Sequence, residues 1–185
     1  MLEIRIHGRG GQGAVLASQI LSYAFFLEGK FSQSFPTFGA ERRGAPVSAF
    51  VRVSDEFINL RSQIIRPNHV LVLSAKLAET VDVASGVWPD GFILINTDKP
   101  PEHYNTIEGA CRIVTLNISS IAAGFGLGSR IMPMVNVPIL GAYAGISRAV
   151  SLESLFEALS RFISANPEGN QKAMKEAFEQ AQTIN

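Results

Sequence analysis

Residues 2–26 constrain the fold of this chain more than any other stretch. Leu2, Ile4 and Ile6 alternate with polar residues, which is the period-two pattern of a β-strand. The next six residues read Gly8-Arg9-Gly10-Gly11-Gln12-Gly13, and from Ala14 to Leu27 the chain is almost continuously apolar. A strand, a glycine turn and a helix in this order are typical of the first unit of a Rossmann-like α/β fold.

The glycine turn matches the G-x-G-x-x-G fingerprint through Gly8, Gly10 and Gly13. In this motif one glycine allows the tight turn, one lets a ligand approach the backbone, and one lets the helix pack closely. The helix that follows offers unpaired N–H groups and a partial positive charge to an anion. Two interpretations stay open at this point. The turn binds a phosphate group, or its glycines serve only the packing of helix on strand.

A dinucleotide cofactor requires a further feature that this sequence lacks. The ribose hydroxyls of NAD are bound by an Asp or Glu about 20 residues after the fingerprint, at the end of the second strand. Residues 29–36 contain no carboxylate, and Glu28 comes too early, at the end of the first helix. The sequence therefore argues against NAD or NADP as a ligand.

The remaining chain alternates between strand and helix patterns. Strands are expected at residues 47–53, 69–73, 92–96 and 111–116, with a shorter strand near 57–60 paired to the first of these. Helices are expected to begin at or after Ser74, Asn117, Pro138, Ser151 and Asn166. This order predicts a single domain over residues 1–185: a Rossmann-like, mostly parallel sheet with helices on both faces and a helical C-terminal third.

The helix at Ala14–Leu27 is apolar on nearly all sides, with its few polar residues on one narrow side. A helix of this kind is buried on both faces, whereas a surface helix shows a single apolar stripe. Either another part of this chain or a second protein chain covers its outer face.

The segment 34–46 fits neither a helix nor a strand, because it combines aromatic, turn-forming and charged residues. Its candidate contact residues are Phe38, Glu41, Arg42 and Arg43. A loop that carries aromatic side chains and paired arginines on a rigid scaffold suggests a binding surface. The alternative is a solvated, charged turn.

Composition excludes several classes of function. Sixteen basic and sixteen acidic residues cancel, which argues against nucleic acid or an anionic membrane as a partner. The apolar runs are too short to cross a membrane, and the chain enters its first strand at once, leaving no room for a signal peptide. A cytoplasmic location is therefore expected. Cys111 is the only cysteine, and His7, His69 and His103 show no metal-ligand spacing, so no catalytic or metal site is predicted.

Several of these motifs together resemble the gamma subunit of 2-oxoacid:ferredoxin oxidoreductases. The resemblance rests on the glycine turn, on residues 38–44 (Phe-Gly-Ala-Glu-Arg-Arg-Gly), on the strand at 47–54, and on the segments 136–141 and 150–155. It covers about the first 165 residues, as judged from the positions of these motifs. The joint pattern is far more specific than the glycine fingerprint alone. Ala45 departs from it, since the family tends to have a second glycine there.

The resemblance implies a role within a larger enzyme. Members of this family convert a 2-oxoacid and coenzyme A to an acyl-coenzyme A and pass electrons to ferredoxin. Thiamine diphosphate and iron–sulfur clusters carry out that chemistry. A single cysteine does not hold such a cluster, so the cofactors are expected in partner subunits and none in this chain alone. This chain is then an accessory subunit, inactive when isolated.

The resemblance also implies which residues contact a ligand and which contact partner subunits. We expect the glycine turn (Gly8, Arg9, Gly10, Gly11, Gln12 and Gly13) to contact a phosphate of coenzyme A, and Phe38, Glu41, Arg42 and Arg43 to contact partner subunits. Two alternatives remain at the level of sequence: an independent NAD(P)-binding oxidoreductase and a non-enzymatic nucleotide-binding module.

Overall fold

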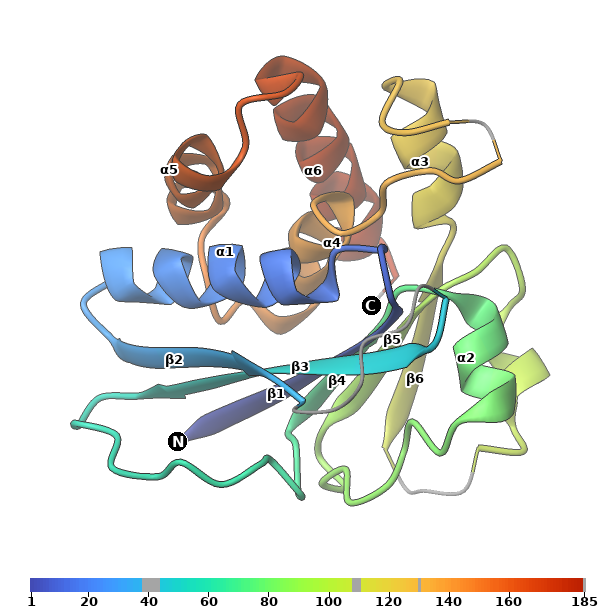
Figure 1. Cartoon of the computed structure of the whole chain (residues 1–185). Helices are drawn as coiled ribbons and strands as arrows, with labels where there is room; N and C mark the ends of the chain where they lie inside the picture. Colours follow the sequence, from blue (N-terminus) through green and yellow to red (C-terminus); the bar gives the residue numbers. More distant parts are fainter. Residues whose placement is uncertain (38–43, 108–110, 130, 185) are drawn as a thin grey trace.

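The computed structural model describes residues 1–37, 44–107, 111–129 and 131–184 (Figure 1). Within these residues, six strands form one sheet in the order β2-β3-β1-β4-β5-β6. Their bounds are β1 Leu2–Arg9, β2 Phe31–Pro36, β3 Pro46–Ser54, β4 His69–Val72, β5 Phe92–Asn96 and β6 Arg112–Leu116. The predicted α/β class is confirmed.

The sheet has a parallel half and an antiparallel half. Strands β1, β4, β5 and β6 are parallel neighbours, as predicted, whereas β3 runs antiparallel to both β1 and β2. After β1, the chain forms β2 and β3 on one side of β1. It then continues to β4 on the other side of β1. Strand order therefore reverses between β1 and β4, and ligands of open α/β sheets bind beyond the carboxyl ends of the strands at such a point.

Three segments differ from the sequence prediction. The expected strand at 57–60 is absent from the described residues, because β1 and β2 occupy both hydrogen-bonding edges of β3. Residues 34–36, expected to be irregular, form the end of β2. Residues 97–104, expected to be a loop, include the short 3-10 helix η1, Pro101–Tyr104.

The helices begin close to the predicted positions. They are α1 Ala14–Leu27, α2 Ala75–Thr80, α3 Ile118–Gly124, α4 Pro138–Ser147, α5 Leu152–Phe162 and α6 Pro167–Gln182. Asn117, Ser151 and Asn166 each accept a hydrogen bond from a backbone N–H of the first turn, at 3.0–3.1 Å. Ser74 occupies the N-cap position of α2 without a side-chain cap bond.

Helices α1, α3, α4, α5 and α6 share the core on one face of the sheet, and α2 packs on the other face (Figure 1). Helix α1 lies between the sheet and α5, and Tyr23 of α1 meets Phe162 of α5 edge to face at 5.9 Å between ring centroids. The second layer over α1 therefore comes from this chain itself. The C-terminal end of α1 is only partly covered, because Phe26 is 59% exposed.

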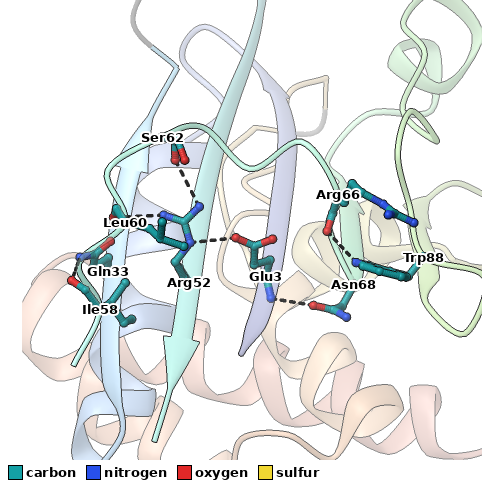
Figure 2. Close-up of polar contacts among 9 residues, drawn as sticks. All are labelled: Glu3, Gln33, Arg52, Ile58, Leu60, Ser62, Arg66, Asn68 and Trp88. Carbon is teal, nitrogen blue, oxygen red and sulfur yellow. Dashed lines mark hydrogen bonds and ion pairs between the residues drawn. The ribbon is translucent and has the colours of Figure 1, made fainter. Parts of the chain in front are cut away.

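An extended segment, residues 55–68, crosses the opposite face of the antiparallel half; we call it the strap. Arg52 of β3 holds it: its guanidinium donates to the carbonyl oxygens of Leu60 (3.3 Å) and Ser62 (3.2 Å) and to Glu3 Oε1 (2.8 Å), as Figure 2 shows. Arg52 is only 1% exposed. The second anchor is Asn68, whose Oδ1 accepts the backbone N–H of Glu3 at 2.9 Å.

Candidate functional site

A crevice of about 580 Å³ lies beyond the carboxyl ends of β1, β4 and β5, where strand order reverses. Its walls are the glycine turn (11–13), the segments that follow β4 (73–75) and β5 (96–98), the start of α3, and residues 131–136 before α4. This is the position at which open α/β sheets bind their ligands.

The glycines of the turn serve different purposes. A Cβ at Gly8 would lie 3.0 Å from Ala14 Cβ and 3.1 Å from a Leu73 methyl carbon, so Gly8 allows the helix to pack on the strand. Gly10 pairs with the chain before β3: its N–H donates to Ala45 at 2.9 Å, and its carbonyl oxygen accepts from Gly44 at 3.2 Å. These two glycines are therefore explained by packing and by backbone hydrogen bonding.

Gly11 and Gly13, which line the crevice, both have a left-handed backbone conformation. Their φ angles of 93° and 77° lie in the left-handed region that favours glycine. Gly13 is the N-cap residue of α1, and its carbonyl oxygen accepts the first helical N–H, that of Ala17, at 2.9 Å. The N–H groups of the first turn of α1 consequently have no acceptor within the helix. Gly13 and Leu16, at this end of the helix, line the crevice.

The structure divides the predicted cofactor-binding residues into two groups. Gly11, Gln12 and Gly13 line the crevice, whereas Gly8, Arg9 and Gly10 do not. Side chains alternate along a strand, so Arg9 belongs to the face of the sheet opposite α1, and its coenzyme A contact stays a prediction. The predicted interface residues Phe38, Glu41, Arg42 and Arg43 lie outside the described residues.

The polar floor of the crevice is mostly structural. Asn96 Nδ2 donates to the carbonyl oxygen of Leu73 (3.0 Å) and to Ser119 Oγ (2.9 Å), while Asn96 Oδ1 accepts the N–H of Ser119 at 3.0 Å. Thr97 Oγ1 accepts the hydroxyl of Tyr104 at 2.9 Å. These bonds fix the ends of β4 and β5 to α3 and η1.

Asn136 differs from these residues and was missed by sequence reasoning, which quoted it only within a resemblance motif. Its side chain lies against Gly13 at the end of the crevice, and it is 2% exposed. Its Nδ2 is buried and has no hydrogen-bond acceptor among the described residues. Sequence offered no signal for this contact, because the two residues lie far apart along the chain.

The buried histidines are not suited to proton transfer at neutral pH. Burial lowers the pKa of His7 to about 3, with a smaller contribution from the charge of Arg5. Burial also lowers the pKa of His69 to about 4, against a weaker opposing effect of Asp90. His7 lies 3.2 Å from Ser48 Oγ and His69 lies 3.1 Å from the hydroxyl of Tyr143. Both imidazoles are therefore neutral structural groups.

The described residues contain no cluster of three or more His, Cys, Asp or Glu side chains that is able to hold a metal ion. Burial raises the pKa of the half-buried Cys111 thiol, which disfavours the reactive thiolate. None of the helices in the described part of the chain is long and apolar enough to span a membrane.

Comparisons with known proteins identify the family of this chain. The family model of pyruvate ferredoxin/flavodoxin oxidoreductase matches residues 3–180. Pyruvate synthase subunit PorC of Methanosarcina barkeri is 49% identical over 86% of this chain and 85% of its own length. The pyruvate/ketoisovalerate oxidoreductases common subunit gamma of Pyrococcus abyssi is 44% identical over 98% of both chains.

A solved structure gives the same result for the fold. The crystal structure of pyruvate oxidoreductase subunit PORC from Thermotoga maritima superposes with a TM-score of 0.81 at 32% identity, covering 96% of this chain and 95% of the other. The chain belongs to the pyruvate ferredoxin/flavodoxin oxidoreductase family.

Proposed function

We propose that this chain is the gamma subunit of a 2-oxoacid:ferredoxin oxidoreductase, a multi-subunit enzyme that oxidatively decarboxylates a 2-oxoacid to an acyl-coenzyme A. The observation that carries the proposal is the match over nearly the whole chain to relatives named as such subunits, at 49% and 44% identity. The crevice adds a site at the position where open α/β sheets bind their ligands.

The cofactors of the reaction belong to partner subunits in this proposal. The residues of this chain do not fit an iron–sulfur cluster, because Cys111 is its only cysteine and about four thiolates are required. Thiamine diphosphate, which supplies the electron sink for decarboxylation when bound, is likewise assigned to a partner. The proposed partners are the subunits that hold these groups, together with ferredoxin as acceptor, in the cytoplasm.

The co-substrate coenzyme A is the ligand proposed for the glycine turn. Its phosphate groups are anionic, and the first turn of α1 presents backbone N–H groups and the positive end of a helix dipole. Arg9, at the end of β1, is proposed to add a charge-assisted contact to the same ligand. Phe38, Glu41, Arg42 and Arg43 are proposed to contact the partner subunits.

The alternative of an independent NAD(P)-binding oxidoreductase is not favoured. Strand β2 ends at Pro36 and contains neither Asp nor Glu, so the ribose-binding acid of that class is missing where it is required. The relatives also do not support a stand-alone nucleotide-binding module, because their names describe subunits of an oxidoreductase.

Reconstitution tests the proposal directly. The purified chain, the partner subunits, and the two together are assayed for reduction of a viologen dye that depends on both a 2-oxoacid and coenzyme A. We expect turnover only from the mixture. Turnover by the chain alone, or full turnover by the partner subunits without it, contradicts the proposed role.

A further inference from the structure

The strap carries an apolar patch that the fold leaves uncovered. Phe57 is 71% exposed and Leu60 is 47% exposed. Phe31, at the start of β2, is also exposed and meets Phe57 edge to face at 6.0 Å between ring centroids. A hollow of about 480 Å³, lined by Met1 and residues 54–60, adjoins this pair. We call Phe31, Phe57 and Leu60 the strap patch; exposed apolar patches of this kind mark interaction surfaces.

The backbone beneath the strap patch is fixed. The carbonyl oxygen of Ile58 accepts from Gln33 Nε2 at 3.0 Å, and those of Leu60 and Ser62 accept from Arg52 (Figure 2). The side chain of Ile58 is buried against the sheet. A surface that is already ordered loses little conformational entropy on binding, so the strap patch is prepared for a partner.

The charges of the strap fall into two groups. Asp55 forms an ion pair with Lys30, and Arg66 stacks on a tryptophan ring at 3.8 Å, so both already have partners within the chain. Glu56 and Arg61 are exposed, and neither forms an ion pair with any residue that the structure describes. The strap therefore presents one free carboxylate and one free guanidinium to its surroundings.

The order of these residues makes the segment 56–61 (Glu-Phe-Ile-Asn-Leu-Arg) complementary to itself. Two copies of the segment that run in opposite directions, about a twofold axis through its middle, place Phe57 of each copy opposite Leu60 of the other. The same axis places Glu56 of each copy opposite Arg61 of the other. One surface that matches itself in this way is what a twofold interface requires, and opposite charges at its rim fix the register.

We propose that the strap is a contact surface between two copies of this chain, related by a twofold axis through residues 56–61. The strap patch forms the apolar centre, the hollow beside it leaves room for a side chain of the second copy, and two Glu56–Arg61 ion pairs form the rim. The strap lies toward the amino end of β1, whereas the crevice lies beyond the carboxyl end, so the contact leaves the crevice open. This inference goes beyond the proposed function and does not depend on it.

Sedimentation velocity of the full-length chain tests the apolar centre. The contact is small, so we expect a weak, concentration-dependent dimer between about 10 μM and 1 mM. Phe57→Ser should weaken the dimer about tenfold. Phe26→Ser is the matched control, because it removes a similarly exposed ring from the end of α1 and should leave the dimer unchanged. A wild-type chain that stays monomeric over the whole range, or equal weakening by the two variants, would overturn the proposal.

Charge reversal tests the twofold arrangement. Glu56→Arg places like charges opposite one another, as does Arg61→Glu, so each variant alone should dimerise about tenfold more weakly than the wild type. In an equimolar mixture of the two variants, the introduced arginine faces the introduced glutamate and the native pair is kept. Native mass spectrometry should therefore find the mixed dimer at close to wild-type affinity. Circular dichroism checks that the variants, which alter exposed side chains, remain folded.

Glu157→Arg controls for net charge. Glu157 is exposed on α5, and its reversal gives the same net charge as Glu56→Arg at a different surface. A mixture of Glu157→Arg with Arg61→Glu should not recover wild-type affinity. Equal recovery in the two mixtures, or none in either, would overturn the twofold contact. The proposal is also overturned if a partner subunit covers the strap, in which case the charge variants lose assembly with that subunit and their mixture does not restore it.

Discussion

The two ends of strand β1 handle buried polar groups in opposite ways. At the amino end, Arg52, Glu3 and Asn68 satisfy one another and the strap, through bonds of 2.8–3.3 Å (Figure 2). At the carboxyl end, His7 Nε2 and Asn136 Nδ2 are buried without a partner among the residues described. A closed network indicates a structural role, whereas an unpaired buried group costs stability.

The strongest test of the comparison removes the central cation of the closed network. Arg52→Met leaves Glu3 without its buried partner and two strap carbonyl oxygens without a donor, so we expect a loss of about 3 kcal/mol in the free energy of unfolding. Urea denaturation followed by circular dichroism measures it. The Michaelis constant for coenzyme A, whose proposed site lies at the other end of β1, should stay unchanged when the folded variant is reconstituted with its partner subunits.

Arg66→Met is the control for this change. Arg66, at an exposed position within the strap, stacks on Trp88 at 3.8 Å from the ring centroid, and its loss should cost about 0.5–1 kcal/mol. Similar costs for the two arginine variants would contradict the view that the amino end depends on a buried network.

The second test uses pH at the carboxyl end. His7 has a folded-state pKa of about 3 and an ordinary value of 6.5, so the unfolded chain binds a proton that the folded chain rejects between these values. The stability that this group contributes is complete above pH 6.5 and is lost as pH falls toward 3. Between pH 6.5 and 4.5 the loss is about 2 kcal/mol, at about 1.4 kcal/mol per pH unit.

The variant His7→Gln should remove the share that His7 contributes, about 2 kcal/mol, as measured by urea denaturation at the two pH values. The lowered pKa of His69, about 4, leaves a dependence of similar size in the variant. His103→Gln alters an exposed histidine and should leave the pH dependence as in the wild type. A wild-type slope retained in His7→Gln would mean that another group causes the acid sensitivity.

The third test asks why glycine is required at position 13. The reason is either its left-handed backbone conformation or the lack of space for a side chain beside Asn136. Gly13→Ala and Gly29→Ala share a left-handed φ, 77° and 78°, and each should cost about 1–2 kcal/mol in backbone strain. Of these two glycines, only Gly13 has a neighbour within 4 Å of the added Cβ, so only Gly13→Ala should also raise the Michaelis constant for coenzyme A in the reconstituted enzyme. Equal constants in the two variants would contradict a site at this end.

The smallest expected effect concerns Arg9. Because packing of the turn does not require its side chain, Arg9→Ala should change the free energy of unfolding by less than about 0.5 kcal/mol. In the reconstituted enzyme, the variant should raise the Michaelis constant for coenzyme A several-fold. An unchanged constant would remove Arg9 from the proposed site and leave the backbone of the turn as its source of donors.

Much of the local structure was predictable because it depends on residues close in sequence. The alternation in β3 placed Ala49, Val51 and Val53 on one face, and all three belong to the main core. Asn117 caps its helix as predicted, since a cap requires only an acceptor side chain two to three residues before its donor. The same local reasoning failed at 57–60, where the partner of β3 depends on which strands compete for its edges.

The sequence by itself determined the class of fold, the positions of most elements, and the family that the glycine turn and later motifs resemble. Tertiary structure alone decided the direction of β2 and β3, the burial of Arg52 under the strap, and the approach of Asn136 to Gly13. The physical reason is the range of the interactions. Periodicity and capping are set within a few residues, whereas strand pairing and the burial of a polar group depend on segments that meet only when the sheet has formed.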